Sequence, residues 1–305
     1  MSKLRNALIE PDEVAAAVAK DFGLPTSTSC TLVGRAFNDT YLVRTDQDRF
    51  ICRLYLNGKY YVRDSTDFLF ELELLEFVRA RGVRVAAPLR RQDGELLGQL
   101  PGHDRVYALF EYAQGGEAQR LNANLARSLG AELARFHRAA DEFASPHHRY
   151  HLGVELLLEQ PYALIQRDEA KDKLMDLTSV PPLQELIDVI RGLPTSNGSY
   201  GLIHADPHPG NVHFSGDAPT FFDFDHCAYG WRAFDLAVLC LNRRDEIREA
   251  VLDGYESIRA VTAEERAAFP TFGYIRRIWD EGDILAMRPA WEGRGFPPLG
   301  KPIAS

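Results

Sequence analysis

The order in which strand-like and helical patterns follow one another constrains the fold of this chain more than any other feature. Before residue 113, five short runs rich in β-branched and aromatic residues occur, with one amphipathic helix among them at 66–81. After residue 121, apolar residues recur mainly with the helical period. The pattern predicts an α+β protein with a small antiparallel-sheet lobe and a larger, mainly helical lobe. The five runs are 30–33, 40–45, 49–56, 95–99 and 105–111.

A Gln-Gly-Gly turn at 114–116 marks the expected boundary between two domains. We expect an N-terminal domain at 1–113, with a leading helix at about 11–22, and a C-terminal domain at 114–305. The C-terminal domain is predicted to contain helices at 122–140, 155–177 and 183–192, strands at 202–204, 212–214 and 220–224, and further helices from 233.

Composition narrows the class of protein. The formal net charge of −9 argues against a dedicated nucleic-acid-binding protein, because neutralising phosphates requires a clustered basic surface. The first residues lack an apolar signal core and no run of 18 apolar residues occurs, so we expect a cytoplasmic protein without a membrane span. Four scattered cysteines without zinc-type spacing predict reduced thiols.

The run His-Ala-Asp-Pro-His-Pro-Gly-Asn at 204–211, followed by Phe-Asp-Phe-Asp at 222–225, carries the clearest chemistry. Phosphoryl transfer from ATP requires a carboxylate near the acceptor hydroxyl and oxygen ligands for Mg²⁺. Asp206 can orient and deprotonate the hydroxyl, and Asn211 can reach the metal from the far end of the same loop. Asp223 would approach the ion from the neighbouring hairpin strand.

Two alternative interpretations of these residues, turn capping and zinc binding, stay open. Single aspartates often cap turns at strand ends, although the combined spacing of the two motifs is less expected by chance than either motif alone. Four histidines in a short stretch can also bind zinc, but the prolines and glycine of 207–210 prevent a helical pair, and the carboxylate and amide set suits Mg²⁺ better. The histidines are His204, His208, His213 and His226.

The segments LIHADPHPGNVHF at 202–214 and FFDFDHCAYGWRAFDLA at 221–237 resemble the aminoglycoside phosphotransferase and choline/homoserine kinase superfamily, relatives of the protein kinases. The resemblance extends from about Val33 to about Leu241 and implies a two-lobed, protein-kinase-like fold. It also implies ATP as donor, Mg²⁺ as cofactor and a small-molecule hydroxyl as acceptor.

Carried over residue by residue, the resemblance makes Asp206 the catalytic base and His204 a structural member of the catalytic loop. Asn211 and Asp223 become the Mg²⁺ ligands. Asp235 matches the buried aspartate that braces the loop, a role compatible with its alternative interpretation as a helix N-terminal cap.

In the N-terminal lobe, Arg53 stands where the family has a phosphate-contacting lysine. A guanidinium group can clamp phosphate oxygens through two donors, so the departure is compatible with activity. Glu71 matches the glutamate that pairs with this basic residue, with Glu73 as a nearby competitor. Alternatively, all three are surface charges.

The remaining nucleotide contacts follow from position alone. The loop at 34–39 lies where kinases cover the ATP phosphates but has a single glycine, so we expect contact through Asn38 and nearby backbone N–H groups. Glu111, Tyr112 and Ala113 lie where adenine would hydrogen-bond to the backbone, and the alternative is an ordinary strand end.

The acceptor is encoded weakly. The segment 279–283, with Trp291 and Glu292, offers carboxylates beside aromatic rings that suit an amine, or it is a solvated helix end. Three functions stay open: a small-molecule kinase, a bacterial stress-response type of protein Ser/Thr kinase, and a nucleotide-binding pseudokinase. The complete motif set argues against the pseudokinase, and the short stretch between Asp223 and Asp235 favours a small molecule.

Overall fold

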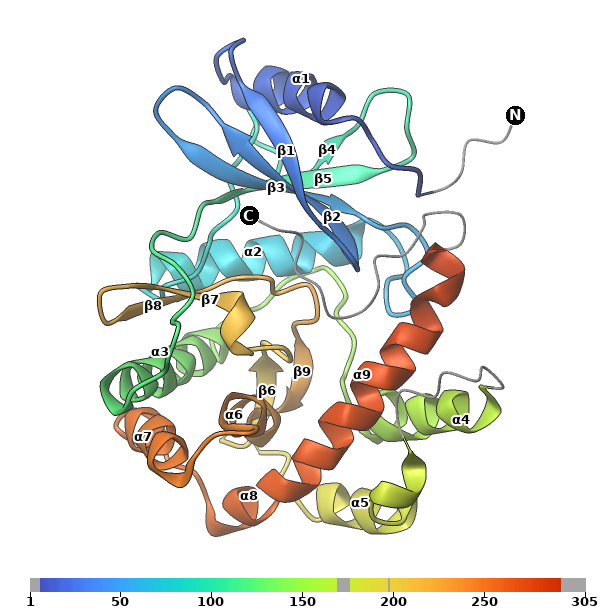
Figure 1. Cartoon of the computed structure of the whole chain (residues 1–305), viewed down its shortest axis with the longest axis vertical. Helices are drawn as coiled ribbons and strands as arrows, with labels where there is room; N and C mark the ends of the chain where they lie inside the picture. The colour runs from blue at the N-terminus through green and yellow to red at the C-terminus, as the bar shows by residue number, and fades with distance from the viewer. Residues whose placement is uncertain (1–5, 169–175, 197, 292–305) are drawn as a thin grey trace. The chain divides into compact units, whose positions relative to one another are not determined.

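The computed structural model describes residues 6–168, 176–196 and 198–291 of the chain. The chain divides into two compact units (Figure 1). The first unit takes in the residues up to 76, residues 86–112 and those from 287, and the second takes in 77–85 and 113–286. Both units are therefore assembled from stretches that are distant in sequence.

A five-stranded antiparallel sheet with the order β1-β2-β3-β5-β4 forms the first unit, together with two helices. The α1 helix begins at Pro11, which suits a first turn, and ends before Gly23, whose φ of 66° closes the helix. The elements are α1 (Pro11–Phe22), β1 (Ser29–Arg35), β2 (Asn38–Arg44), β3 (Arg49–Tyr55), α2 (Thr66–Ala80), β4 (Gly98–Gln99) and β5 (Val106–Glu111). The last residues of α2, from Phe77, belong to the second unit.

One face of the sheet forms a core with α1. Val14 and Val18 of the helix belong to the same buried cluster as Tyr41 and Leu54 of the strands. Such burial of alternating strand residues is what the strand-like runs predicted. The strand predicted at 95–99 is too long, since β4 contains only Gly98 and Gln99. The residues before it belong to a turn at Gly94, which has a φ of 88° and across which the backbone N–H of Arg91 donates to the carbonyl oxygen of Glu95.

Helices dominate the second unit, as the sequence predicts. Its elements are α3 (Ala123–Ala140), a π-helical turn (Glu155–Glu159), α4 (Gln160–Arg167), α5 (Leu183–Arg191), β6 (Tyr200–Ile203), β7 (Val212–Ser215), β8 (Ala218–Phe221), β9 (Ala228–Trp231), α6 (Arg232–Cys240), α7 (Asp245–Glu256), α8 (Ala263–Ala267) and α9 (Phe269–Trp291). The last residues of α9, from Met287, belong to the first unit. The β6 strand pairs with β9, and β7 pairs with β8.

Three details of this unit differ from the sequence prediction. The helix expected at 155–177 begins with the π-helical turn and ends at Arg167, where Asp168 becomes extended; residues 169–175 lie outside the described part. The strand expected at 220–224 ends at Phe221, because Asp223 has a φ of 63° that a strand cannot accommodate. The β9 strand was not predicted, since its four residues include a glycine.

No helix in the described ranges is long and apolar enough to span a bilayer. All four cysteines are free thiols, and Cys52, Cys227 and Cys240 are buried.

Two glycines let α3 and α7 pack closely. A Cβ atom added to Gly254 of α7 would lie 1.9 Å from the carbonyl oxygen of Arg127 in α3. A Cβ added to Gly130 of α3 would lie 1.9 Å from the carbonyl oxygen of Val251 in α7. Both obstacles are backbone atoms, so the helices themselves would have to separate.

Replacement of Gly254 by alanine should therefore lower the free energy of unfolding by about 1–3 kcal/mol, as overpacking usually does. Urea unfolding followed by circular dichroism measures the change. Gly153→Ala is the matched control, since nothing lies within 4 Å of a Cβ there, and it should stay within about 0.5 kcal/mol of the wild type. Equal losses in the two variants would contradict this account of the helix crossing.

Candidate active site

A single buried carboxylate holds the loop that follows β6. The backbone N–H groups of His204 and Ala205 donate to Oδ2 and Oδ1 of Asp235, each at 2.8 Å. Ala205 has a φ of 68°, in the left-handed region that a residue with a side chain rarely adopts. Two charge-assisted hydrogen bonds thus fix an unfavourable backbone shape directly before Asp206.

The carboxylate of Asp235 also has a partner outside the loop. Asp235 lies on α6 and is fully buried, with Nε2 of His137 3.0 Å from its Oδ2. The hydroxyl of Tyr255 lies 2.8 Å from the other ring nitrogen of His137. Burial keeps the pKa of His137 well below its usual value, so its neutral ring donates Nε2–H to Asp235 and accepts the Tyr255 hydroxyl. Burial raises the pKa of Asp235 to about 7, and the two backbone N–H groups oppose this rise.

His204 is an internal support of the loop. Its ring centroid lies 4.1 Å from that of Phe224, its Nε2 lies 3.1 Å from the carbonyl oxygen of Phe222, and its Nδ1 accepts the backbone N–H of Asp206 at 3.3 Å. Burial lowers the pKa of His204 to about 4. The ring is therefore neutral at physiological pH, and its nitrogens join the backbone of the loop to the backbone of the residue that follows β8.

Asp206 lies in a network that engages both carboxylate oxygens. Its Oδ1 accepts from Nη2 of Arg276 at 2.6 Å, and its Oδ2 accepts from Nδ2 of Asn211 at 3.1 Å. Nε2 of His208 lies 3.5 Å from the same Oδ2. Burial by itself raises the pKa of Asp206. Arg276 and then the nearby histidines lower it, and together they outweigh burial, so the pKa of Asp206 lies below its ordinary value.

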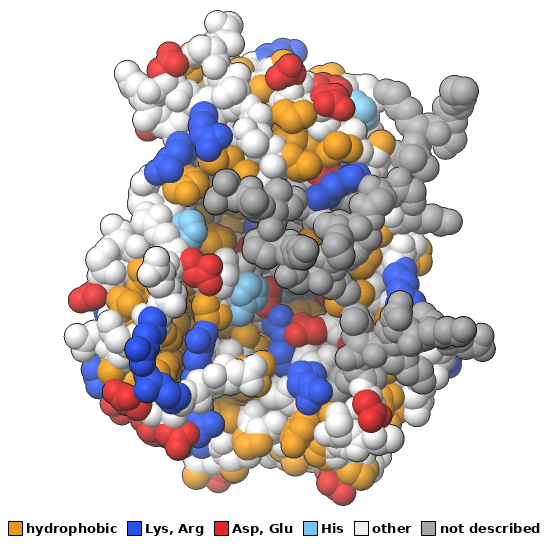
Figure 2. Space-filling model, in the orientation of Figure 1, with side chains coloured by type: hydrophobic (Ala, Val, Ile, Leu, Met, Phe, Trp, Pro, Cys, Tyr) orange, Lys and Arg blue, Asp and Glu red, His pale blue; other side chains and the backbone are white. Residues whose placement is uncertain are grey.

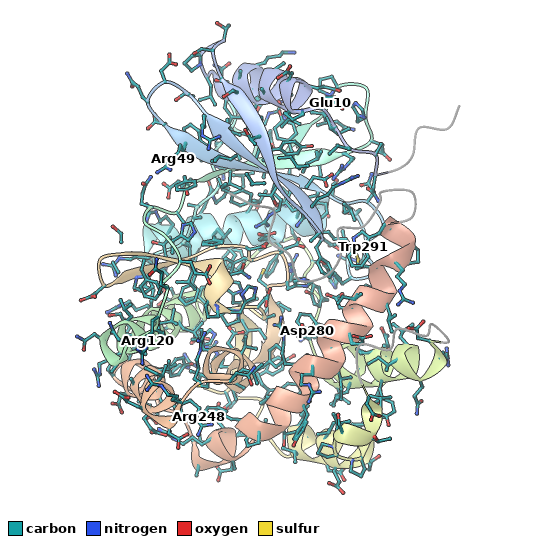
Figure 3. All side chains as sticks on the ribbon, viewed as in Figure 1. Glu10, Arg49, Arg120, Arg248, Asp280 and Trp291 are labelled. Atoms are coloured by element: carbon teal, nitrogen blue, oxygen red, sulfur yellow. The ribbon has the colours of Figure 1, made fainter. Side chains whose placement is uncertain are left out.

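Sequence reasoning missed Arg276, which comes from α9, 70 residues after Asp206. Its Nε bonds to Asp280 at 2.8 Å, and its Nη1 donates to the carbonyl oxygen of Ala205 at 3.0 Å. Figure 3 labels Asp280 on α9. Burial lowers the pKa of Arg276, but the two carboxylates raise it above its usual value. The spacing of Arg276 and Asp280, four residues apart on one helix face, was the only available signal.

Asn211 and Asp223 carry side-chain oxygen atoms of the kind that bind a hard cation. Asn211 ends a short 3₁₀ turn, and its Nδ2 donates to the backbone oxygen of Asp206 at 2.9 Å as well as to its carboxylate. The amide nitrogen therefore bonds to Asp206, and the amide oxygen is the atom of this side chain that could bind a cation. Asp223 supplies a carboxylate from a backbone held at positive φ. An amide oxygen and a carboxylate suit a hard cation such as Mg²⁺.

The acidic segment proposed for the acceptor lies within α9 and not at a solvated helix end, so the alternative interpretation is wrong. Trp279, Glu281 and Asp283 are buried, and His226 contacts both Asp283, at 3.7 Å, and the Trp279 ring. The indole Nε1 of Trp279 is buried and has no acceptor among the described residues. Trp291 belongs to the first unit, and residue 292 lies outside the described part.

In the first unit, a buried ion pair joins β3 to α2. Nη1 of Arg53 lies 2.5 Å from Oε1 of Glu71, and the guanidinium lies over the ring of Phe110 with 4.7 Å to its centroid. Glu71 is fully buried, whereas Glu73 is half-buried. The structure thus brings Arg53 together with Glu71, and neither is a solvated surface charge.

Lys59 was not singled out from the sequence, yet it is buried beside the loop at 34–39. Its ammonium group donates to Oδ1 of Asn38 at 2.8 Å. The same group lies within 5.6–5.7 Å of the ring centroids of Tyr55, Tyr61 and Phe68. A lysine in a non-repeating turn gives no periodic signal, which explains why pattern reasoning missed it.

The three residues expected at the adenine position contact other parts of the chain, through the backbone for Glu111 and Ala113 and through the side chain for Tyr112. Glu111 ends β5 and donates its N–H to the carbonyl oxygen of Ala87 at 2.9 Å. Tyr112 has the guanidinium of Arg49 4.3 Å above its ring. The carbonyl oxygen of Ala113 lies 2.7 Å from Nδ1 of His213.

The chain matches the phosphotransferase enzyme family over residues 30–269. An uncharacterized protein of Synechocystis is 33% identical over 287 residues, which cover 89% of this chain and 77% of that protein. A homoserine kinase of Rhizobium etli is 30% identical over 268 residues, covering 80% of this chain and 77% of that enzyme.

Among solved structures, an amicoumacin kinase in complex with AMP-PNP and Ca²⁺ is similar, with a TM-score of 0.74 and 22% identity. The likeness covers 95% of this chain and 89% of that one. The kinase-like α+β fold and the resemblance drawn from the two motifs are thereby confirmed. The chain belongs to the phosphotransferase enzyme family.

Proposed function

We propose that this protein transfers the γ-phosphoryl group of ATP, in the presence of Mg²⁺, to a hydroxyl group of a small amino alcohol or hydroxy amino acid. The observation that carries the proposal is the braced loop on which Asp206 and Asn211 contact each other, with Asn211 bonding through its amide nitrogen. Such a loop holds a hydroxyl-binding carboxylate and a metal ligand at a fixed separation, which phosphoryl transfer requires.

Asp206 would accept a hydrogen bond from the acceptor hydroxyl and aim its oxygen at the γ-phosphorus. The hydroxyl oxygen forms the new P–O bond, the bond from the γ-phosphorus to the bridging oxygen of ADP breaks, and the hydroxyl proton passes to Asp206. A carboxylate of low pKa suffices, because the transition state is loose and the hydroxyl proton leaves late. Arg276 would keep the carboxylate ionised and oriented.

The chain's own residues can hold the other parts of the reaction. When bound, Mg²⁺ would neutralise charge on the phosphates, and Asn211 and Asp223 would supply its protein ligands. Arg53, held by Glu71, would contact phosphate oxygens. Lys59 would support the loop at 34–39 through Asn38.

The acceptor class rests on two independent supports. One relative at 30% identity is a homoserine kinase, whose substrate name denotes an amino acid with a side-chain hydroxyl. The buried carboxylates of α9 and the ring of Trp279 offer an electronegative setting for the amino group of such an acceptor. Only eight residues separate Phe224 from Ala233, too few for the long activation segment that positions peptide substrates in protein kinases.

The function is tested by thermal-shift titration with ATP, with and without Mg²⁺, followed by a transfer screen over homoserine, amino alcohols, sugars and aminoglycosides. A ligand that binds only the folded protein raises its melting temperature. We expect a metal-dependent shift and transfer to acceptors that carry both an amine and a hydroxyl. Nucleotide binding without transfer to any acceptor would instead favour a regulatory pseudokinase.

Asp206→Asn keeps the shape of the side chain and removes its charge. Turnover should fall by about 10²–10⁴-fold, the usual contribution of a positioned acid–base group, while Mg–ATP affinity should change little. Asp223→Asn is the contrasting variant, in which Mg–ATP affinity and turnover should fall together. Steady-state kinetics and calorimetry separate the two effects, and near-normal turnover of Asp206→Asn would remove it from the mechanism.

Arg276→Gln should move the acid limb of the kcat/KM profile to higher pH. Without the cation, burial dominates and the pKa of Asp206 rises, although His204, His208 and His226 remain nearby. Because the ionised carboxylate is the active form, activity at low pH is then lost at a higher pH than in the wild type.

Two variants calibrate this pH experiment. Arg276→Lys restores the charge and should return the limb most of the way. Arg277→Gln removes a neighbouring exposed arginine on the same helix and should leave the profile unchanged. If the profiles of Arg276→Gln and Arg277→Gln coincide, Arg276 does not set the pKa of Asp206.

A further inference from the structure

The second unit has a cavity of about 620 Å³ that the proposed reaction does not use. Its walls come from 117–121, the catalytic-loop residues 208–210, β7, and the turn between α6 and α7. Small-metabolite sites typically have volumes of about 300–1,000 Å³. The cavity is therefore large enough for a ligand of its own, and it touches the loop that carries Asp206.

Positive charge is concentrated in the walls. Three arginines, Arg120, Arg243 and Arg244, line the cavity, against the single carboxylate of Glu117. The protein as a whole carries a formal net charge of −9, so this concentration runs against the overall balance. Figure 2 shows Lys and Arg side chains gathered on the face over α3 and α7, and Figure 3 labels Arg120 there.

Within residues 6–168, 176–196 and 198–291, no side-chain hydrogen bond or ion pair of Arg120, Arg243 or Arg244 occurs. Neighbouring arginines behave differently, since Arg127 and Arg248 pair with aspartates of α7. The Nε atom of Arg243 is buried without an acceptor, which is costly unless a ligand satisfies it.

The backbone has a left-handed residue, Asn242, directly before two of the arginines that line the cavity. After α6 ends at Cys240, Asn242 takes a φ of 56°, a left-handed conformation that asparagine tolerates better than most residues. The resulting reversal places Arg243 and Arg244 directly before α7, and Asn242 itself lines the cavity. Two arginines in succession thus follow a left-handed residue and line the cavity.

His208 connects the cavity to the catalytic loop. It lines the cavity, its Nδ1 accepts the backbone N–H of Gly210 at 3.0 Å, and its Nε2 lies 3.5 Å from Oδ2 of Asp206. Because Nδ1 accepts a hydrogen bond, Nε2 carries the ring N–H, and an anion in the cavity would compete with Asp206 for this donor.

We propose that this cavity is a second binding site, for the phosphomonoester of a small metabolite, and that the catalytic loop responds to its occupancy through His208. Guanidinium groups match phosphate oxygens with paired N–H donors, and a phosphate dianion balances the excess positive charge. Binding needs only the arginines, whereas the regulatory role rests on the proposed function of Asp206. Since the proposed reaction makes a phosphomonoester, the site gives that product a route to act back on the loop.

Isothermal calorimetry with glycerol 3-phosphate and with inorganic phosphate tests the site, in chloride of matched ionic strength and with a saturating non-hydrolysable ATP analogue. The analogue removes any contribution of the nucleotide site. The double variant Arg243→Gln/Arg244→Gln should bind at least about tenfold more weakly, the effect of losing charge-assisted hydrogen bonds. Arg120→Gln should weaken binding as well. Arg248→Gln, an exposed arginine of α7 that pairs with Asp245, is the matched control and should bind like the wild type.

The NMR signals of the His208 imidazole provide a second readout that needs no enzymatic activity. They should shift as glycerol 3-phosphate is added to the wild type, and should not shift in the double variant. Equal affinity in the double variant and the wild type overturns the site. Binding without any response of His208 overturns the coupling to the loop. Because turnover is not measured, neither result depends on whether the protein is an ATP-dependent kinase.

Discussion

The buried carboxylate of Asp235 is the interaction on which the candidate active site depends. It accepts the backbone N–H groups of two successive loop residues and a third N–H from His137, itself held by Tyr255. An unpaired carboxylate at this depth would be highly unfavourable, and the unfavourable φ of Ala205 would be equally so without these bonds. The hydrogen bonds between the loop and Asp235 offset both costs at once. They hold the loop in this shape, and the shape determines the position of Asp206.

Arg276 extends the same logic to the side chain of Asp206. A guanidinium group that bonds to both the loop carbonyl and the carboxylate fixes the backbone and the reacting group relative to each other. It also lowers the basicity of Asp206, which would be a disadvantage if strong proton abstraction were needed. Phosphoryl transfer through a loose transition state needs orientation more than basicity. The ion pair therefore fits this chemistry better than it would fit carbon-acid chemistry.

In the first unit, the guanidinium group of Arg53 is held by the residues around it. Glu71 engages Nη1 of Arg53, and the ring of Phe110 lies against the guanidinium plane. These two contacts fix the orientation of the planar guanidinium group. Lys59, buried among aromatic rings, bonds to Asn38 through its ammonium group. If Arg53 contacts phosphate as proposed, it would do so as a directional fork and not as a point charge.

The features that the sequence predicts are those that depend on short-range patterns. Strand and helix periodicity located the sheet, α2 and α3, and motif spacing located Asp206 and Asn211, because these depend on neighbours within a few residues. Arg276 escaped, since its partner lies 70 residues away and a helix of 23 residues offers many equivalent arginine positions. The basic cavity escaped for the same reason: its arginines come from separate stretches, and only the positive φ of Asn242 brings two of them into its wall. Features that tertiary structure creates from distant segments leave no local pattern, and these are the features that would tune the reactivity and regulation of a shared fold.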